Sequence, residues 1–337
     1  MTEAAVLTGL GAYLPPRRVT NEELADRFDT TDEWITTRTG IRTRRWVDPG
    51  VCTGDLAVEA GHRALKSANI AADHTGIDAL VLATTTPDHP CPGTAPDVAA
   101  RLGLGSVAAF DISAVCSGFV YALETAANSI LAGRSRKVLV IGAETYSTIL
   151  DPTDRSTSVI FGDGAGAVVL RTGRADEPGA IAGFDLGSDG SQRELISIPA
   201  GGSRQRSAGT VPTEAEQYFT MHGRKVFVSA VQHMAASSRT LLDRVGWPVG
   251  TLNHLVGHQA NIRILRAVAE HLGVPAERTV VNLDQVGNTS AASIPLALAD
   301  AAAHGALSPG DRLLLTAFGG GLTWGSVAIT WPGITPA

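Results

Sequence analysis

The stretch Phe110–Tyr121, FDISAVCSGFVY, places a lone cysteine, Cys116, between small residues directly before a helical pattern. The preceding Val107–Ile112 predicts a short buried strand, and apolar residues recur at helical spacing from Ala122 to Leu131. Free N–H groups and the dipole at a helix start stabilise a thiolate. The pattern is typical of enzymes that expose a nucleophile, while a buried structural cysteine is an equally good interpretation of this stretch alone.

Composition and charge narrow the class of protein. The 337 residues suffice for a large core, organised as two domains or one layered unit, and the formal net charge of −6 argues against nucleic acid or an anionic membrane as partner. Three cysteines without CxxC spacing favour neither a disulfide framework nor a zinc site. With no signal-peptide pattern and no long apolar run, the sequence predicts a soluble cytoplasmic protein.

The order of the predicted elements favours an α/β fold. Apolar strands alternate with helical patterns, which predicts a largely parallel sheet covered on both faces. Residues 172–216 are polar and predict a long connection with room for one hairpin. The predicted strands are 6–14, 77–83, 137–144 and 165–171, and the predicted helices are 21–28, 54–69 and 221–245.

An internal repeat relates the two halves of the chain. At a constant offset of 175 residues, Leu80 falls on Leu255, Leu123 on Leu298 and Val138 on Leu313. One offset therefore aligns a strand, a helix and a second strand. On this alignment Cys116 falls on Ala291, so two helix starts are expected to face each other across a pseudo-twofold axis.

Polar groups follow the predicted strands of the second half, where ligands bind in α/β sheets. His258 ends a strand, Asn288 precedes a helix, and Gly319–Gly321 follow the last core strand. Together with Cys116 they supply a nucleophile, an imidazole, an amide and free N–H groups, as thioester chemistry requires. Taken singly, a core histidine and a helix-capping asparagine remain the simpler interpretations.

Trp34 and nearby arginines suggest a second feature. Trp34 next to Arg38 could stack a planar base and pair with phosphates, although an ordinary surface loop with one packed tryptophan is the simpler interpretation of these residues alone.

At this point the chain resembles a known family nearly end to end. It is similar to the 3-oxoacyl-(acyl carrier protein) synthase III family, the initiating condensing enzymes of type II fatty acid synthesis, within the thiolase-like superfamily. The motifs that carry the resemblance are Asp32–Ile35, Arg38–Ile41, the Cys116 stretch, Asp151–Arg155, Phe161–Gly166, His258–Asn261, Gly287–Ser293 and Phe318–Gly321.

The resemblance implies a five-layered αβαβα thiolase-like fold built from two pseudo-repeated halves. It implies an N-terminal half at residues 1–171 with the nucleophile, a connecting region at 172–220 near the substrate tunnel, and a C-terminal half at 221–337 with the histidine and asparagine. It further implies a homodimer and no metal or redox cofactor, with coenzyme A thioesters serving as substrates. The expected partners are an acyl-CoA and malonyl-acyl carrier protein.

Carried over by position, the resemblance also assigns roles to single residues. It makes Cys116 the acylated nucleophile and places His258 and Asn288 on the carbonyl of the malonyl thioester. The N–H groups of Cys116 and Gly320 would form the oxyanion hole. The residues expected to bind coenzyme A or substrate are Thr30, Trp34, Arg38, Arg155, Gly223, Phe227, Ala260 and Asn261, with the adenine between Trp34 and Arg155.

Some positions depart from the family pattern. Cys91 stands where many relatives have a bulkier aromatic residue in the acyl pocket, often across a dimer, so we expect a starter larger than acetyl. Basic residues for docking an acidic carrier are Arg263, Arg266, Arg224 and Lys225, whereas Glu270 and His271 replace frequent lysines.

These departures leave alternative activities open. The main alternative is a paralogue that loads an unusual starter in a polyketide pathway, or an acyltransferase with another acceptor. A cysteine hydrolase and a non-catalytic subunit are less favoured.

Overall fold

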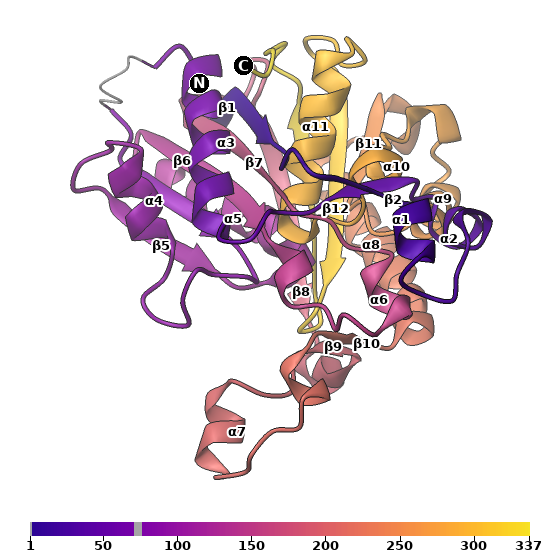
Figure 1. The fold of residues 1–337 in the computed structure, drawn as a ribbon. Helices are drawn as coiled ribbons and strands as arrows, with labels where there is room; N and C mark the ends of the chain where they lie inside the picture. The colour runs from indigo at the N-terminus through magenta and orange to yellow at the C-terminus, as the bar shows by residue number, and fades with distance from the viewer. Residues whose placement is uncertain (1, 71–75) are drawn as a thin grey trace.

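The structure is a computed structural model that describes residues 2–70 and 76–337. Two sheets alternate with three helical layers (Figure 1), so the five-layered thiolase-like arrangement is confirmed. The first sheet has the order β1-β7-β6-β4-β5 and the second the order β11-β12-β13-β8. Their strands are β1 (Glu3–Tyr13), β4 (Ala79–Ala83), β5 (Ala108–Ile112), β6 (Lys137–Glu144), β7 (Gly164–Arg174), β8 (Ile181–Ser188), β11 (His254–Gly257), β12 (Arg312–Gly319) and β13 (Thr323–Thr330).

The helices divide among three layers. The apolar α5 and α11 lie between the sheets, α3 and α4 cover the outer face of the first sheet, and α8 packs on the outer face of the second with α9 against it. These helices are α3 (Thr53–Ser67), α4 (Ala95–Arg101), α5 (Gly118–Leu131), α8 (Gly223–Val245), α9 (Ile262–Leu272) and α11 (Ser293–Ala303). A central layer covered on both sides explains why α5 and α11 are apolar nearly all round.

Shorter elements connect and surround the layers. The short strands are β2 (Arg18–Thr20), β3 (Thr43–Arg45), β9 (Ile196–Ser197) and β10 (Thr220–Met221). The short helices are α1 (Asn21–Ala25), α2 (Asp32–Thr39), α6 (Arg155–Ser158), α7 (Ser203–Ser207), α10 (Leu283–Val286), η1 (Val115–Ser117), η2 (Tyr146–Thr148), η3 (Gly190–Leu195), η4 (Ala215–Gln217), η5 (Val249–Thr251), η6 (Ala276–Arg278) and η7 (Ser290–Ala292). Within the described residues, no helix has the length and apolar character needed to cross a membrane.

The expectation of a largely parallel sheet is wrong for the first sheet. β4 pairs in parallel with β5 and β6, but β7 is antiparallel to both β6 and β1. The reason is the connection from β6 to β7, which contains only η2, α6 and loops. A crossover helix, which a parallel return needs, is lacking there.

The burial expected for the strand before Cys116 is also wrong. β5 is the edge strand of the first sheet, its residues are half-buried or exposed, and Phe110 is 42% exposed. An apolar sequence alone does not distinguish a central strand from an edge strand that leaves one side uncovered.

The internal repeat is confirmed at the level of residue pairing. Ala79 pairs with Val138 in the first sheet, and the residues 175 positions later, His254 and Leu313, pair in the second. The turns before the central helices match as well: η1 and η7 lie 175 residues apart and contact each other. Val115 and Ser290, at equivalent positions, both have φ of 48°. The two halves therefore share one backbone plan.

Residues 172–220 contain more structure than the predicted hairpin. β8 pairs with β13 in the second sheet, and the two-residue strands β9 and β10 pair with each other. The part that includes α7 is largely exposed and projects away from the layers (Figure 1). The domain limits at residues 171 and 220 stay a prediction, to which the structure adds that β8 belongs to the second sheet.

Candidate active site

Cys116 lies in η1, directly before α5, with a buried side chain. The end of β12 runs close behind it: a Cβ atom on Gly319 would stand 2.7 Å from the Cys116 backbone nitrogen, so only glycine permits this approach. The hydroxyl of Thr323 lies within hydrogen-bond distance of the carbonyl oxygens of Ala114 and Gly320, at 3.1 and 2.9 Å, and can donate to either. These bonds hold the glycine turn at residues 319–321 against the turn that carries the sulfur.

His258 follows β11 and is buried. Its backbone N–H donates to the carbonyl of Thr316 at 2.8 Å, and its Nδ1 lies 2.6 Å from the Ser293 hydroxyl. Burial lowers the pKa of the imidazole to about 3, so the ring is neutral at physiological pH. With Nδ1 engaged by Ser293, only Nε2 is available to a ligand.

Asn288 precedes η7 and is held through its backbone. Its N–H donates to the carbonyl of Ile160, and its carbonyl accepts from the N–H of Gly162, both at 2.9 Å. A Cβ atom on Gly162 would stand 2.3 Å from the Val286 carbonyl oxygen, which explains the glycine in this motif. The Asn288 Oδ1 accepts from the Ser290 N–H at 2.9 Å, and this bond leaves the amide NH2 free to donate.

One cavity of about 530 Å³ brings these three side chains together. Its lining is mainly apolar, which suits chemistry that must exclude water. Of the residues expected to bind substrate, six line it: Trp34, Arg38, Gly223, Phe227, Ala260 and Asn261. Other lining residues include Phe161, Ile196, Phe219, Met221, Met234, Arg224, Arg263 and Phe318.

Trp34 is stacked with two arginines at the mouth of this cavity. The guanidinium carbon of Arg38 lies 4.3 Å from the indole centroid and that of Arg155 lies 4.9 Å from it. A planar base between Trp34 and Arg155 would need about 7 Å, two van der Waals separations. Arg155 must therefore move outward by about 2 Å for the expected sandwich to form.

Asn261 joins the two sides of the mouth. Its Oδ1 accepts from the Arg263 N–H at 2.8 Å and so caps α9, while its Nδ2 donates to the Arg38 carbonyl at 3.0 Å at the end of α2. Residues 29–41, which could have been a surface loop, thus contain a helix capped by Thr31. Thr30 does not line the cavity, and its hydroxyl is buried without a hydrogen-bond partner in the described part of the chain.

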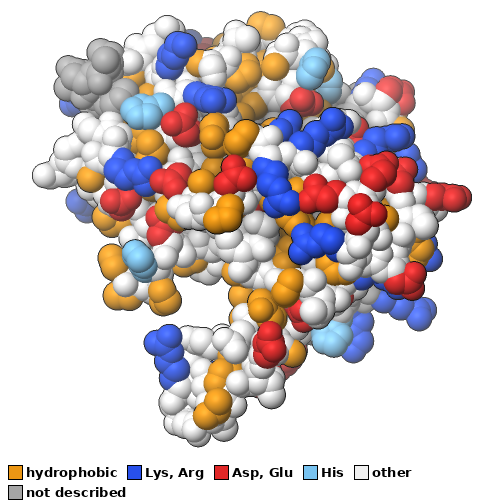
Figure 2. All heavy atoms as spheres, viewed as in Figure 1, with side chains coloured by type: hydrophobic (Ala, Val, Ile, Leu, Met, Phe, Trp, Pro, Cys, Tyr) orange, Lys and Arg blue, Asp and Glu red, His pale blue; other side chains and the backbone are white. Residues whose placement is uncertain are grey.

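The basic residues expected to dock a carrier are exposed at the starts of α8 and α9. Arg224, Lys225, Arg263 and Arg266 are all exposed, and Arg263 lies 5.6 Å over the ring of Phe227. Only Arg224 and Arg263 reach the cavity. On the face shown in Figure 2, cationic and anionic side chains are intermixed, so a basic docking surface has to be local.

Cys91 does not line the cavity. It is exposed, in a loop between Asp88 and Thr94. A role of Cys91 in an acyl pocket would therefore require this loop to meet the cavity of a second subunit.

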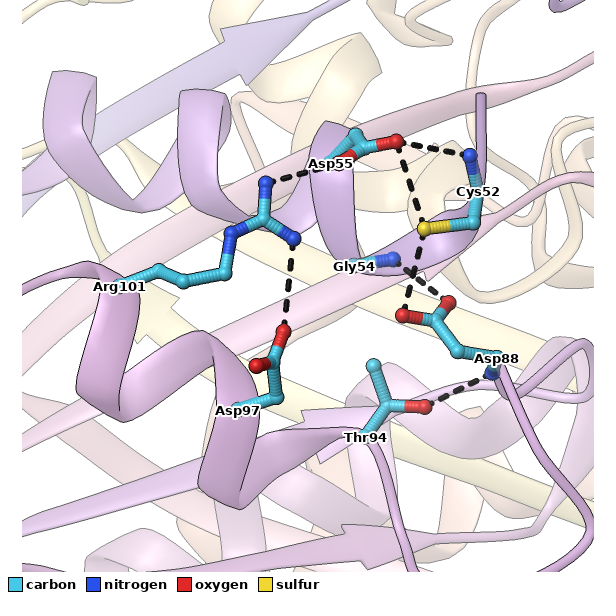
Figure 3. A network of polar contacts seen from close by, with 7 residues as sticks. All are labelled: Cys52, Gly54, Asp55, Asp88, Thr94, Asp97 and Arg101. Carbon is cyan, nitrogen blue, oxygen red and sulfur yellow. Dashed lines mark hydrogen bonds and ion pairs between the residues drawn. The ribbon is translucent and has the colours of Figure 1, made fainter. Parts of the chain in front are cut away.

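The base of that loop is held by a polar network (Figure 3). Asp88 accepts from the Cys52 thiol at 3.3 Å and from the Gly54 N–H at 2.9 Å, and its own N–H donates to the Thr94 hydroxyl. Burial, with the neighbouring carboxylates, raises the pKa of Cys52 to about 11. Cys52 is thus a structural thiol that anchors the loop to the start of α3.

The electrostatics of Cys116 differ from the sequence-based expectation of a stabilised thiolate. Burial raises the pKa of its thiol to about 12, and the Ser290 hydroxyl and the local backbone offset this only in part. Backbone donors at the helix start lower the pKa of the thiol less than the loss of surrounding water raises it. In the resting structure Cys116 is a thiol that needs a base.

Sequence reasoning missed the polar residues behind the site. Ser293, which binds His258, lies in the motif Gly287–Ser293 but was given no role. Glu144 was placed only at the end of a strand, yet it is fully buried beside the Ala291 N–H. An acidic residue ending an apolar run is rare enough to have signalled it. Within residues 2–70 and 76–337, no three His, Cys, Asp or Glu side chains are grouped to hold a metal ion.

Comparisons with known proteins agree with this geometry. Residues 110–190 match the model of 3-oxoacyl-[acyl-carrier-protein] synthase III, and residues 242–331 match the model of its C-terminal part. The chain is 64% identical over 335 residues to beta-ketoacyl-[acyl-carrier-protein] synthase III 5 of Streptomyces coelicolor, with 99% of both chains covered. It is 53% identical to beta-ketoacyl-[acyl-carrier-protein] synthase III of Pseudomonas aeruginosa, with 100% of this chain and 99% of the relative covered.

Solved structures show the same likeness. The crystal structure of 3-oxoacyl-(acyl carrier protein) synthase III from Pseudomonas aeruginosa PAO1 has a TM-score of 0.92 and 51% identity, covering 99% of this chain and 100% of that one. The priming beta-ketosynthase of the R1128 polyketide pathway has a TM-score of 0.90 and 34% identity, covering 99% and 97%. The chain therefore belongs to the 3-oxoacyl-(acyl carrier protein) synthase III family, whose members are condensing enzymes of the acyltransferase class.

Proposed function

We propose that this protein is an initiating condensing enzyme that joins an acyl-CoA starter to malonyl-acyl carrier protein, giving 3-oxoacyl-acyl carrier protein, coenzyme A and CO2. The observation that carries the proposal is the meeting of Cys116, His258 and Asn288 on one largely apolar cavity, whose mouth holds Trp34 and Arg38. The proposed reaction uses coenzyme A and carrier-protein thioesters as substrates and requires no metal or redox cofactor.

The first half-reaction acylates Cys116. Its sulfur attacks the carbonyl of the acyl-CoA, the carbonyl oxygen becomes negative, and the CoA sulfur leaves. Gly319 lies against the Cys116 backbone nitrogen, which supports an oxyanion hole made from the N–H groups of Cys116 and Gly320. Trp34, Arg38 and Arg155 would bind the adenine and phosphates of CoA, with Thr30 at the edge of this region.

The second half-reaction forms the carbon–carbon bond. The malonyl thioester enters the same tunnel, past Gly223, Phe227, Ala260 and Asn261. With the Ser293 hydroxyl donating to Nδ1, the His258 proton lies on Nε2, where it donates to the thioester oxygen beside the Asn288 amide. Both donors stabilise the enolate that forms when CO2 leaves, and the enolate carbon then displaces the Cys116 sulfur.

Carrier docking and the assembly follow from the same proposal. Arg224, Lys225, Arg263 and Arg266 surround the outer ends of α8 and α9 and would attract an acidic carrier protein. A homodimer would cover the exposed edge strand β5 and bring the Cys91 loop toward the partner's cavity. With cysteine in place of a larger side chain there, the acyl pocket would accept starters larger than acetyl.

The likeness to a polyketide priming ketosynthase favours one alternative within the same chemistry: loading of an unusual starter for a secondary pathway. A simple acyltransferase is less favoured, because the free Asn288 amide beside His258 suits a decarboxylation step that plain acyl transfer does not contain.

The test is a competition of acetyl-, butyryl-, isobutyryl- and longer acyl-CoAs, with malonyl-acyl carrier protein as extender. Mass spectrometry reads the adduct on Cys116 and the product on the carrier. We expect a 3-oxoacyl product from a starter larger than acetyl. Acetyl preference would overturn the starter assignment, and acylation without a condensation product would overturn the condensing function.

A further inference from the structure

A buried carboxylate stands behind the nucleophile and is not used by the mechanism above. Glu144 ends β6 and is fully buried. The Thr85 N–H donates to its oxygens at 3.2 and 3.1 Å, the Thr86 hydroxyl at 2.9 Å and the Ala291 N–H at 3.5 Å. Donors from two segments thus surround one buried carboxyl group, whose charged form burial alone would disfavour.

Ser290 begins η7, the turn that contacts both η1, where Cys116 lies, and β6, which ends at Glu144. Its side chain is fully buried, and among the described residues no aligned hydrogen-bond partner occupies its hydroxyl. The hydroxyl is nevertheless close enough to lower the pKa of three groups that burial raises: the Cys116 thiol, the Glu144 carboxyl and the Tyr146 phenol. Buried hydroxyl groups usually have a hydrogen-bond partner, so one that lies near three polar groups without an aligned bond to any of them is unusual.

Cys116 needs a proton acceptor, because burial keeps its sulfur protonated. His258 is a poor one, since burial lowers its pKa to about 3 and Ser293 occupies Nδ1. Burial raises the pKa of Glu144 to about 7, offset in part by its Thr85 and Thr86 hydrogen bonds, so a large share is carboxylate at neutral pH. A base works best when its pKa lies near the working pH.

We propose that Glu144 accepts the proton of Cys116 through the hydroxyl of Ser290. This inference rests on the proposed function, because it describes how the nucleophile of that reaction is made. Neither Glu144 nor Ser290 lines the substrate cavity, so both would act on the sulfur without contacting the substrate.

The proton balances over one catalytic cycle. In acylation the sulfur–carbon bond forms as the Cys116 S–H bond breaks. Its proton passes to the Ser290 oxygen while the Ser290 proton passes to Glu144. The CoA sulfur leaves with the electron pair of its carbon–sulfur bond and takes a proton from solvent. In condensation the Cys116 sulfur leaves with its bonding pair and recovers the proton from Glu144 along the same path.

The titratable groups facing Glu144 are Cys116 in η1 and Tyr146 in η2. Burial raises the pKa of both groups, and the negative charge of Glu144 raises it further. The other neighbours, from the segment after β4 and from η7, are uncharged donors. Above pH 7 Glu144 is the carboxylate and can accept a proton, and below pH 7 it is the acid and cannot. The rate of Cys116 reactions should therefore rise through about pH 7.

The test compares Ser290→Ala with Tyr146→Phe. Each removes one buried hydroxyl that has no hydrogen-bond partner in the described part of the chain, and each hydroxyl lies near Cys116 and Glu144. Ser290→Ala keeps the backbone bond to Asn288. Cys116 is alkylated with iodoacetamide from pH 5.5 to 9 and, separately, acylated by acyl-CoA in a single turnover. We expect Ser290→Ala to slow both reactions by on the order of 10²-fold at pH 7.5 and to remove the rise near pH 7. Tyr146→Phe should keep the rise.

A wild-type pH profile in Ser290→Ala would overturn the proposal, and so would an equal loss in both variants at unchanged melting temperature. Glu144→Gln should lose the same rise, and if it does not fold, Ser290→Ala still decides. Iodoacetamide needs no CoA site. A protein that alkylates with the expected profile but is not acylated would contradict the proposed function and leave the proton path standing.

Discussion

The turns η1 and η7 have the same backbone plan and face different neighbours. At η1 the Cys116 nitrogen meets the glycine turn at the end of β12, and the sulfur opens on the cavity. At η7 the Ala291 nitrogen meets the Glu144 carboxylate, and Ala291 does not reach the cavity. Glu144 and Gly319 are themselves equivalent under the 175-residue offset. One turn is thus open to substrate and the other is closed by a buried charge.

The same division extends to the strand ends. His258 in the second half corresponds to Ala83 in the first, as Cys116 corresponds to Ala291. At each of these pairs one half carries the reactive group and the other a small residue that leaves room for it. The comparison teaches that a duplicated fold need not have two sites, because each half can supply what the other has lost.

Moving the nucleophile should give the largest effect. In the double variant Cys116→Ala, Ala291→Cys the thiol sits on the equivalent turn, but it faces the central helices and the Glu144 region. We expect acylation to fall by on the order of 10⁴-fold or more. Intact mass after incubation with acyl-CoA measures this, with Cys116→Ala alone as control. A stable adduct on the introduced thiol would show that the two turns are interchangeable.

Adding one methyl group at the approach to each turn should separate chemistry from stability. Gly319→Ala presses on the Cys116 nitrogen and Gly142→Ala on the Ala291 carbonyl. We expect Gly319→Ala to slow acylation by on the order of 10²-fold. Gly142→Ala should instead mainly lower the free energy of unfolding, by about 1–3 kcal/mol. Single-turnover acylation rates and melting temperatures of the two variants measure this difference. Equal losses of rate in Gly319→Ala and Gly142→Ala would contradict the prediction.

Trp34 and Trp247 both pack against arginine side chains, but only Trp34 lines the cavity. Trp34 carries Arg38 and Arg155, whereas Trp247 in the second half carries Arg312 at 4.9 Å. Trp34→Ala should raise the KM for acyl-CoA by about 10-fold or more, because stacking on a base contributes about 1–3 kcal/mol. Iodoacetamide reactivity should not change. Steady-state kinetics with Trp247→Ala as the matched control measures this; an equal rise in KM for both would place the nucleotide elsewhere.

The smallest effect concerns stability in acid. The pKa of His258 is lowered to about 3 in the folded protein by burial, so its stabilising contribution is present above pH 6.5 and is lost as the pH falls. At pH 5 the expected loss is about 2 kcal/mol relative to pH 8. His258→Gln should lose that much less on acidification, measured by urea unfolding, than the exposed-site variant His89→Gln. Parallel pH profiles for the two variants would mean that the pKa of His258 is not lowered in the folded protein.

The sequence predicted the repeat, the central helix and the meeting of Cys116, His258 and Asn288 at one site, because the fold preserves the 175-residue offset and places strand ends and helix starts together. The catalytic roles of these three residues stay a prediction. It did not predict that β7 runs antiparallel to β6. The direction of a strand depends on the connection before it, and the connection from β6 to β7 has no crossover helix. It misjudged β5, because burial depends on which neighbour lies beside a strand. The pKa of Cys116 is raised, whereas its position at a helix start predicted a lowered value. Burial has the larger effect, and burial depends on how the whole chain folds.

The assignments of Cys91 and of the docking arginines have a different standing. Cys91 was singled out as a departure from the family pattern and the arginines by their charge, and the effect of both depends on surfaces that a second molecule completes. Glu144 is the converse case: it lies deep inside one chain, yet no motif marks it, because its partners come from segments 59 and 147 residues away in sequence.

The central layer has a consequence for how the chain reaches its native state during synthesis. Every strand of the first sheet is present by residue 174, but one face of α5 packs against β8, β12 and β13. Until residue 330 has left the ribosome, the face of α5 that carries Val120, which lies against Gly325 of β13, and Tyr121, which binds Gly187 of β8, has nothing to cover it. A nascent chain of this protein should therefore be a client for chaperones that bind apolar helices, and a truncated first half should aggregate.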